Sequence, residues 1–144
     1  MVLVYTVSDT PATELDESGN TMYVMRNTNN TNMALTTLDS NLAAETITDE
    51  NLDFDNYVVV EGNYIKSVAK NQYFTGTNGN VSFDNSGTSY TISLYSSNQY
   101  RISATSGRTT YYLKQTNTTV QMSSGNSGNR YWYFYPVEKK YVVE

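Results

Sequence analysis

The feature that most constrains this chain is an internal repeat with a period of 39 residues. The segments 34–42, 73–81 and 112–120 align without a gap when the sequence is written in rows of that length. Apolar residues then share three columns. The first column holds Leu35, Phe74 and Leu113, the second Leu42, Val81 and Val120, and the third Ala44, Phe83 and Met122. Because self-similarity at a fixed period marks repeated supersecondary structure, the three segments are predicted to adopt one common conformation.

Each segment carries the pattern of a β-hairpin. Asp39, Asn78 and Asn117 stand where the chain must turn, and short Asx side chains tolerate turn conformations. Segments of strand-like composition, rich in aromatic and β-branched residues, flank the hairpins on both sides. Those before the hairpins are residues 23–26, 64–67 and 100–103, and those after them are 57–60, 90–94 and 132–135.

Four strands taken three times predict an all-β domain over residues 1–144, with repeats at about 20–61, 62–97 and 98–136. The predicted fold is a β-trefoil, a short six-strand barrel capped by three hairpins. A β-propeller is the alternative, but three blades are fewer than the usual range of roughly four to eight. Residues 2–7 and 141–143 also have strand patterns. We expect them to pair as an added ribbon or to complete the first and last barrel strands.

The composition removes most enzyme chemistries. The chain contains no cysteine and no histidine, which excludes thiol nucleophiles, Ser-His-Asp triads and the usual zinc ligand sets. We therefore predict a protein that is not an enzyme and has no catalytic residues, cofactor or bound metal. No run of residues approaches the apolar length of a membrane span, so no membrane insertion is expected. A net charge of −5 also disfavours nucleic acid as a partner.

The acidic segment 45–56 is the one candidate for a calcium site, because clustered carboxylates supply oxygen ligands. It lacks the central glycine and the terminal glutamate of an EF-hand loop, so a solvent-facing loop is predicted. Two of its acids could act as a glycosidase pair only if they stood about 5–10 Å apart across a cleft. Nothing in the sequence builds that cleft.

Aromatic residues recur at matching places in the repeats. Tyrosine leads the first strand of each unit, Tyr-Phe or Tyr-Leu opens the hairpin at residues 73–74 and 112–113, and the last strand contains Trp132. Over residues 20–136 this pattern resembles the ricin-B-like β-trefoil lectins and carbohydrate-binding modules. It more closely resembles the Tyr-, Asn- and Thr-rich trefoil-like modules appended to secreted bacterial surface proteins and glycosidases. The Gln-x-Trp signature of ricin-like repeats is missing from all three copies, and Arg130-Tyr131-Trp132 is the nearest substitute.

The resemblance implies a non-catalytic carbohydrate-binding module of a secreted or cell-surface protein, with neighbouring domains in a larger chain. Because the signature is missing, no sugar-binding residue is transferred by position. The alternative function is a structural or adhesion spacer that binds protein or packs against neighbouring domains. In either case the predicted location is extracellular.

The ligand surface is predicted from strand alternation. Flat tyrosine rings stack on the apolar faces of sugars, and fourteen tyrosines are available. If Phe74 and Leu113 point inward, the tyrosines beside them point outward, whereas Trp132 is predicted to anchor the core. The predicted ligand-binding residues are Tyr73, Tyr112, Asn78, Asn117, Lys114 and Tyr133. Repeat one has Ala34 and Asp39 at these places, so we expect at most two similar sites.

Charge is divided unevenly along the chain. Residues 1–61 contain eleven acids and one base, Arg26, for a net charge of −10, whereas residues 62–144 contain eight bases and three acids, for +5. One sector of the molecule is therefore predicted to be acidic and the other mildly basic. Arg101, Arg108, Lys114 and Arg130 could cradle an acidic sugar such as a sialic or uronic acid. The favoured alternative is a solvated surface that packs against neighbouring domains.

Overall fold

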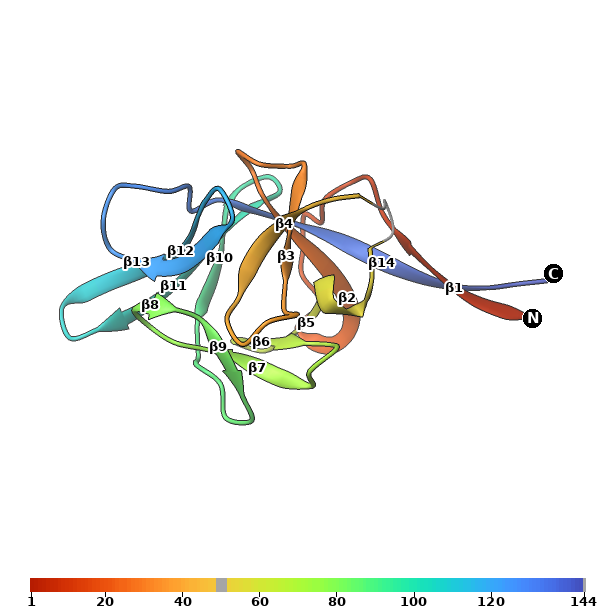
Figure 1. Ribbon diagram of the computed structural model, residues 1–144, viewed down its shortest axis with the longest axis horizontal. Helices are drawn as coiled ribbons and strands as arrows, with labels where there is room; N and C mark the ends of the chain where they lie inside the picture. Colours follow the sequence, from red (N-terminus) through yellow and green to blue (C-terminus); the bar gives the residue numbers. More distant parts are fainter. Residues whose placement is uncertain (49–51, 144) are drawn as a thin grey trace.

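The computed structural model describes residues 1–48 and 52–143, and its regular structure is almost entirely antiparallel β-sheet, with 58% of the residues in strands (Figure 1). The strands are β1 (Val2–Val7), β2 (Ser18–Asn27), β3 (Met33–Thr36), β4 (Ala43–Thr46), β5 (Tyr57–Glu61), β6 (Tyr64–Ser67), β7 (Gln72–Thr75), β8 (Gly79–Asn80), β9 (Ser82–Asp84), β10 (Thr91–Ser96), β11 (Gln99–Ser106), β12 (Thr109–Thr116), β13 (Thr119–Ser123) and β14 (Trp132–Val142). A short 3-10 helix, η1, covers Phe54–Asn56. Within the described ranges, no helix is long and apolar enough to cross a membrane.

The three predicted hairpins are present, and they pair in equivalent registers. They consist of β3 with β4, β7 with β9, and β12 with β13. Residues of the first and third predicted columns stand directly opposite one another, in the pairs Leu35–Ala44, Phe74–Phe83 and Leu113–Met122. All members of the three columns are buried except Phe83, which is partly buried against the same core. The sequence period therefore predicted the three equivalent hairpins and their core residues correctly, and the structure adds their registers.

The hairpins are joined to one another by backbone hydrogen bonds. The amide of Leu42 donates to the carbonyl oxygen of Val81 at 2.7 Å, and the amide of Ala44 donates to that of Thr118 at 3.1 Å. Strand β13 also pairs with β4 and with β8. One hydrophobic cluster runs beneath all three hairpins, because the inward residues of each contribute to it.

The hairpins and the remaining strands belong to one curled antiparallel sheet. Strands β11, β14, β2, β5 and β6 are neighbours in that order, and β10 pairs with the free side of β11. The amide of Tyr90 donates to the carbonyl oxygen of Asn63 at 2.8 Å, which links the segments that lead into β10 and β6. Trp132 and Phe134 lie on the inner side of this sheet and are fully buried. The indole N–H of Trp132 donates to the carbonyl oxygen of Leu113 at 2.8 Å, so its predicted place in the core is confirmed.

The two ends of the chain form a ribbon that projects from the body of the molecule (Figure 1). Strand β1 pairs along its whole length with the last part of β14, from Val2 opposite Val142 to Val7 opposite Val137. This confirms the expected pairing of the end segments as an added ribbon. The segment predicted at 141–143 is not a separate strand, because β14 runs without a break from Trp132 to Val142.

Acidic and amide side chains of the segment 45–56 hold local structure where that segment is described. A carboxylate oxygen of Asp53 accepts a hydrogen bond from the amide of Asp55 at 3.1 Å and caps η1. The side-chain amide of Asn56 donates to the carbonyl oxygen of Leu35 at 3.0 Å and to Glu45 Oε1 at 2.9 Å. Residues 49–51 of the calcium candidate lie outside the described residues. Elsewhere in the described chain, no three acidic side chains are grouped to hold a metal ion.

The buried phenol of Tyr90 predicts a pH dependence of stability. Its hydroxyl donates to the carbonyl oxygen of Gly76 at 2.6 Å. Burial raises the pKa of Tyr90 from 10.0 to about 12, because the phenolate would lose its hydration. The unfolded chain therefore releases this proton at a lower pH than the folded chain. The protonated phenol of Tyr90 therefore contributes its full stability to the folded chain below pH 10. We expect the free energy of unfolding to fall by up to about 3 kcal/mol between pH 10 and 12.

Urea denaturation as a function of pH measures this effect, with Tyr90→Phe as the comparison. The phenylalanine variant has no proton to release at this position, so its stability should decline less steeply above pH 10. The stability difference between the two proteins should therefore shrink as the pH rises. A difference that stays constant through this range would show that Tyr90 titrates as in the unfolded chain.

Candidate functional site

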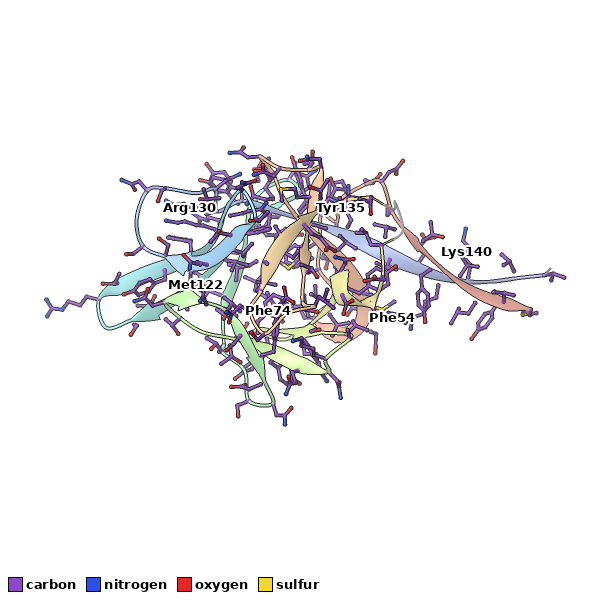
Figure 2. All side chains as sticks on the ribbon, in the orientation of Figure 1. Phe54, Phe74, Met122, Arg130, Tyr135 and Lys140 are labelled. Carbon is purple, nitrogen blue, oxygen red and sulfur yellow. The ribbon has the colours of Figure 1, made fainter. Side chains whose placement is uncertain are left out.

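A cavity of about 780 Å³ lies on the outer face of strands β2 and β14. Its walls include Arg26 from β2 and Tyr133 and Tyr135 from β14. Asp9, from the segment that follows β1, and Asn98, from the turn between β10 and β11, complete the polar part of the lining. We call this cavity the Arg26 pocket. Figure 2 shows Tyr135 on the upper side of the body in that view, away from the projecting ribbon that carries Lys140.

The residues of the pocket face outward because of the same alternation that builds the core. Arg26 stands directly opposite Tyr133 in the pairing of β2 with β14, and paired residues share a face of the sheet. The next pair along, Met25 and Phe134, points the other way and is fully buried. Tyr135 lies two residues beyond Tyr133 and therefore returns to the outer face, where both rings are half-buried.

Arg26 is the cation of the pocket, and its hydrogen-bonding capacity is only partly used. Its guanidinium carbon lies 4.7 Å from the ring centroid of Tyr135, and Nη1 donates to the carbonyl oxygen of Thr31 at 3.4 Å. Nε is buried and makes no hydrogen bond with any described residue. Leaving such a donor unsatisfied costs on the order of 1–3 kcal/mol. Nη2 makes no hydrogen bond with a described residue and is not buried, so it is the donor that a ligand oxygen can reach.

The two tyrosines of the pocket have different environments. Their ring centroids lie 5.9 Å apart with an interplanar angle of 70°, so one flat ligand stacks on only one of them. Arg26 covers Tyr135, which leaves Tyr133 as the platform. Burial raises the pKa of Tyr135, while the charge of Arg26 opposes that shift. Tyr135 is therefore a neutral phenol that can donate one hydrogen bond at physiological pH.

Of the six predicted ligand-binding residues, Tyr133 lines the Arg26 pocket, and the structure places the other five elsewhere. Tyr73 is half-buried on β7, where its ring packs edge-on against Tyr64 with centroids 5.6 Å apart. Its hydroxyl donates to Glu61 Oε2 at 3.1 Å, and this bond raises the pKa of Tyr73. Asn78 is exposed in the turn after β7. The structure therefore gives Tyr73 protein partners for both its ring and its hydroxyl.

The predicted residues of the third hairpin are also separated. Tyr112 lies beneath Arg130, whose guanidinium carbon is 4.5 Å from the ring centroid. Lys114 is buried and donates from Nζ to the carbonyl oxygen of Gly125. Burial lowers the pKa of Lys114, and the positive charge of Arg130 lowers it further. Asn117 stands in the turn with a φ of 56° and lines a different, shallow polar cavity of about 460 Å³. At the rise of an extended strand, Tyr112 and Asn117 are about 16 Å apart.

Among the described residues that line the Arg26 pocket, Tyr133 is the only one that was predicted as ligand-binding from the sequence; Arg26, Tyr135, Asp9 and Asn98 were not. Arg26 had one available signal, because it is the only base among residues 1–61. Asp9 and Asn98 had none. They stand on connections between strands, and only the folded chain brings them to the same cavity.

The Arg26 pocket thus combines a guanidinium group with spare donors, a tyrosine platform, a carboxylate and an amide. These groups suit the noncovalent binding of a small polar ligand that has one flat face. The arrangement offers stacking on one side and hydrogen bonds on the others. Neither a scan against models of known protein families nor a search of curated protein sequences found a match to this chain.

Proposed function

We propose that this chain is a non-catalytic carbohydrate-binding module and that the Arg26 pocket holds a sugar unit. The observation that carries the proposal is the outward-facing Tyr133 platform beside Arg26 in a cavity of about 780 Å³. Small-molecule sites have volumes of about 300–1,000 Å³. The apolar face of a pyranose fits a tyrosine ring, while its hydroxyls suit the guanidinium, carboxylate and amide groups of Arg26, Asp9 and Asn98.

The fold that we infer is a β-trefoil. Three hairpins in equivalent registers, joined by hydrogen bonds between them, support this reading. Strands β2, β5, β6, β10, β11 and β14 would form its barrel. Many lectin-like modules use such a scaffold, and this analogy supports the wider proposal of a secreted or surface module that holds a larger protein near glycans.

A glycan array followed by calorimetric titration of a bound glycan tests the proposal. We expect Tyr133→Ala to weaken binding at least about tenfold, equivalent to about 1.4 kcal/mol, because the stacking platform is removed. Arg26→Gln should also weaken it, since the guanidinium is lost while much of the side-chain length stays. Tyr64→Ala serves as the matched control, because Tyr64 is an exposed tyrosine on β6 outside the pocket.

Two results would contradict this proposal, the first its function and the second its site. One is the absence of binding to every glycan by a protein whose circular dichroism spectrum is native. The other is a Tyr133→Ala variant that binds as tightly as the wild type. In that second case the chain would still be a lectin, but the Arg26 pocket would not be its site.

The projecting ribbon favours a second function, that of a spacer or adhesion domain in contact with another protein. Val2, Leu3, Tyr141 and Val142 are exposed on this ribbon. Exposed apolar side chains gathered on one element are typical of contact surfaces. Two results together would support this function instead. The wild-type chain would bind no glycan and would self-associate in light scattering. The substitutions Leu3→Asp and Tyr141→Asp would abolish the self-association.

A further inference from the structure

A second cluster of arginines and tyrosines lies outside the Arg26 pocket. Arg101 on β11 and Arg130, which precedes β14, converge on the ring of Tyr112, with guanidinium carbons 6.0 Å and 4.5 Å from its centroid. All three side chains are half-buried. Figure 2 shows Arg130 and Tyr135 on the same upper side of the body but well separated along its long axis. The cluster is therefore distinct from the pocket that Tyr135 lines.

Aromatic rings hold both guanidinium groups in place. Arg101 also lies 5.0 Å from the ring centroid of Tyr95, so it stands between two tyrosines. Tyr95 in turn packs on Tyr131, with ring centroids 4.4 Å apart. Contacts between guanidinium planes and ring faces restrict the rotamers of arginine, which reduces the entropy lost when it binds a ligand. The two arginines are thus already oriented before any ligand arrives.

Neither Arg101 nor Arg130 forms a salt bridge with a described residue. The acids described in residues 62–143 are Asp84 and Glu138, and both interact elsewhere: Asp84 accepts hydrogen bonds from Thr75, Ser86 and Gly87, and Glu138 lies 4.0 Å from Lys140. Lys114, two residues after Tyr112 on β12, adds a third cation, and the charge of Arg130 helps to lower its pKa. The charges of Arg130 and Lys114 repel each other, and an anion bound beside Arg130 would offset that repulsion.

Arg101 has an unused donor. Its Nε is buried and has no hydrogen-bond partner among the described residues. A guanidinium group presents donors in a planar fork that matches the two oxygens of a carboxylate or sulfate. Because Nε is closed to solvent, a bound oxyanion would bond the Nη1 and Nη2 groups of Arg101, which are not buried, and would balance the charge of the cluster.

We propose that Arg101 and Arg130 bind the sulfate or carboxylate group of an acidic polysaccharide, with Tyr112 as the floor of the site. This inference rests on the proposed function for the class of its ligand, but it uses different residues. A sugar chain is favoured over nucleic acid because residues 1–61 carry a net charge of −10, which repels a long phosphate backbone. The compact cluster suits one anionic group on an otherwise neutral chain.

Calorimetric titration with a heparin-derived hexasaccharide tests the proposal. Arg101→Gln and Arg130→Gln should each weaken binding about tenfold, equivalent to about 1.4 kcal/mol. Arg130→Lys should recover only part of the loss, because an ammonium group keeps the charge without the planar fork. Arg108→Gln is the matched control: it removes the same charge from the exposed turn between β11 and β12, and it should bind as the wild type does.

Ionic strength gives an independent measurement. Raising it from about 0.01 M to about 0.1 M shortens the Debye length from about 30 Å to about 10 Å. Binding of the hexasaccharide by the wild type should weaken over this range, and the double variant Arg101→Gln/Arg130→Gln should show a smaller dependence. Native circular dichroism spectra and melting temperatures establish that each variant is folded.

The proposal is overturned if Arg108→Gln weakens binding as much as Arg130→Gln, since net charge alone would then explain the affinity. It is also overturned if the folded wild type does not bind the hexasaccharide. Neutral glycans separate this inference from the proposed function. Loss of neutral binding in Tyr133→Ala, without loss in Arg130→Gln, supports the Arg26 pocket alone. Binding of the acidic probe without any neutral ligand supports the Arg101 and Arg130 site alone.

Discussion

Replacing Trp132 by alanine should lower the free energy of unfolding by about 3–5 kcal/mol. The side chain is fully buried in the main hydrophobic cluster, so its removal leaves a large cavity. It also removes the indole donor from the buried carbonyl oxygen of Leu113. Domains are stable by about 5–15 kcal/mol, so this substitution should remove a large share of the total. Urea denaturation followed by far-UV circular dichroism measures it, since Trp132 is the only tryptophan available for fluorescence.

The next residue on the same strand provides the control. Tyr133 faces outward and is half-buried, so Tyr133→Ala should cost only about 1 kcal/mol. The contrast tests the orientation of β14 directly, because neighbouring residues of a strand point to opposite faces. If Tyr133→Ala were the more destabilising change, the faces would be reversed, and the Arg26 pocket would lose its platform.

A second large effect is expected at Gly76, after strand β7. Its φ of +140° is a backbone conformation that residues with a Cβ rarely adopt, and an added Cβ would lie 2.7 Å from the backbone oxygen of Asn80. The amide of Gly76 also donates to Thr88 Oγ1 at 2.8 Å, and its carbonyl oxygen accepts the hydroxyl of Tyr90. We expect Gly76→Ala to cost about 3 kcal/mol, since both the strain and the contact act against folding.

Gly62→Ala is the matched control for this substitution. Gly62 has a φ of +60° in the turn between β5 and β6, and no atom lies within 4 Å of an added Cβ. The substitution therefore introduces only the left-handed conformation of a non-glycine residue, at a cost of about 1–2 kcal/mol. Thermal and urea denaturation of both variants give the comparison. If both substitutions lowered the free energy of unfolding equally, the close approach of Gly76 to the backbone oxygen of Asn80 would be ruled out.

The period of the sequence was a reliable guide to pairing and burial. It predicted that Leu35, Phe74 and Leu113 would occupy equivalent buried places, and their hairpins do pair in equivalent registers. This success has a local cause. In a hairpin the two strands are close in sequence, so a turn residue and the alternation of apolar side chains together decide the register.

The period was a poor guide to which polar residues lie together. Tyr112 and Asn117 belong to one hairpin, but an extended strand holds them about 16 Å apart. Lys114 was predicted to reach a ligand, yet it is buried, with its ammonium group held by Gly125. The loop between β13 and β14 creates this environment, and a repeat pattern contains no information about how such a loop folds back.

The amino-acid pattern alone was sufficient to decide which side chains turn inward, because alternation along a strand is a property of local backbone geometry. It identified Trp132 as a core residue and Tyr133 as an outward one. The neighbours of Tyr133 were decided only by the tertiary structure. Arg26 is more than a hundred residues away in the chain, and the pairing of β2 with β14 brings the two side chains to one cavity. Such a contact depends on how distant strands assemble, which no local pattern encodes.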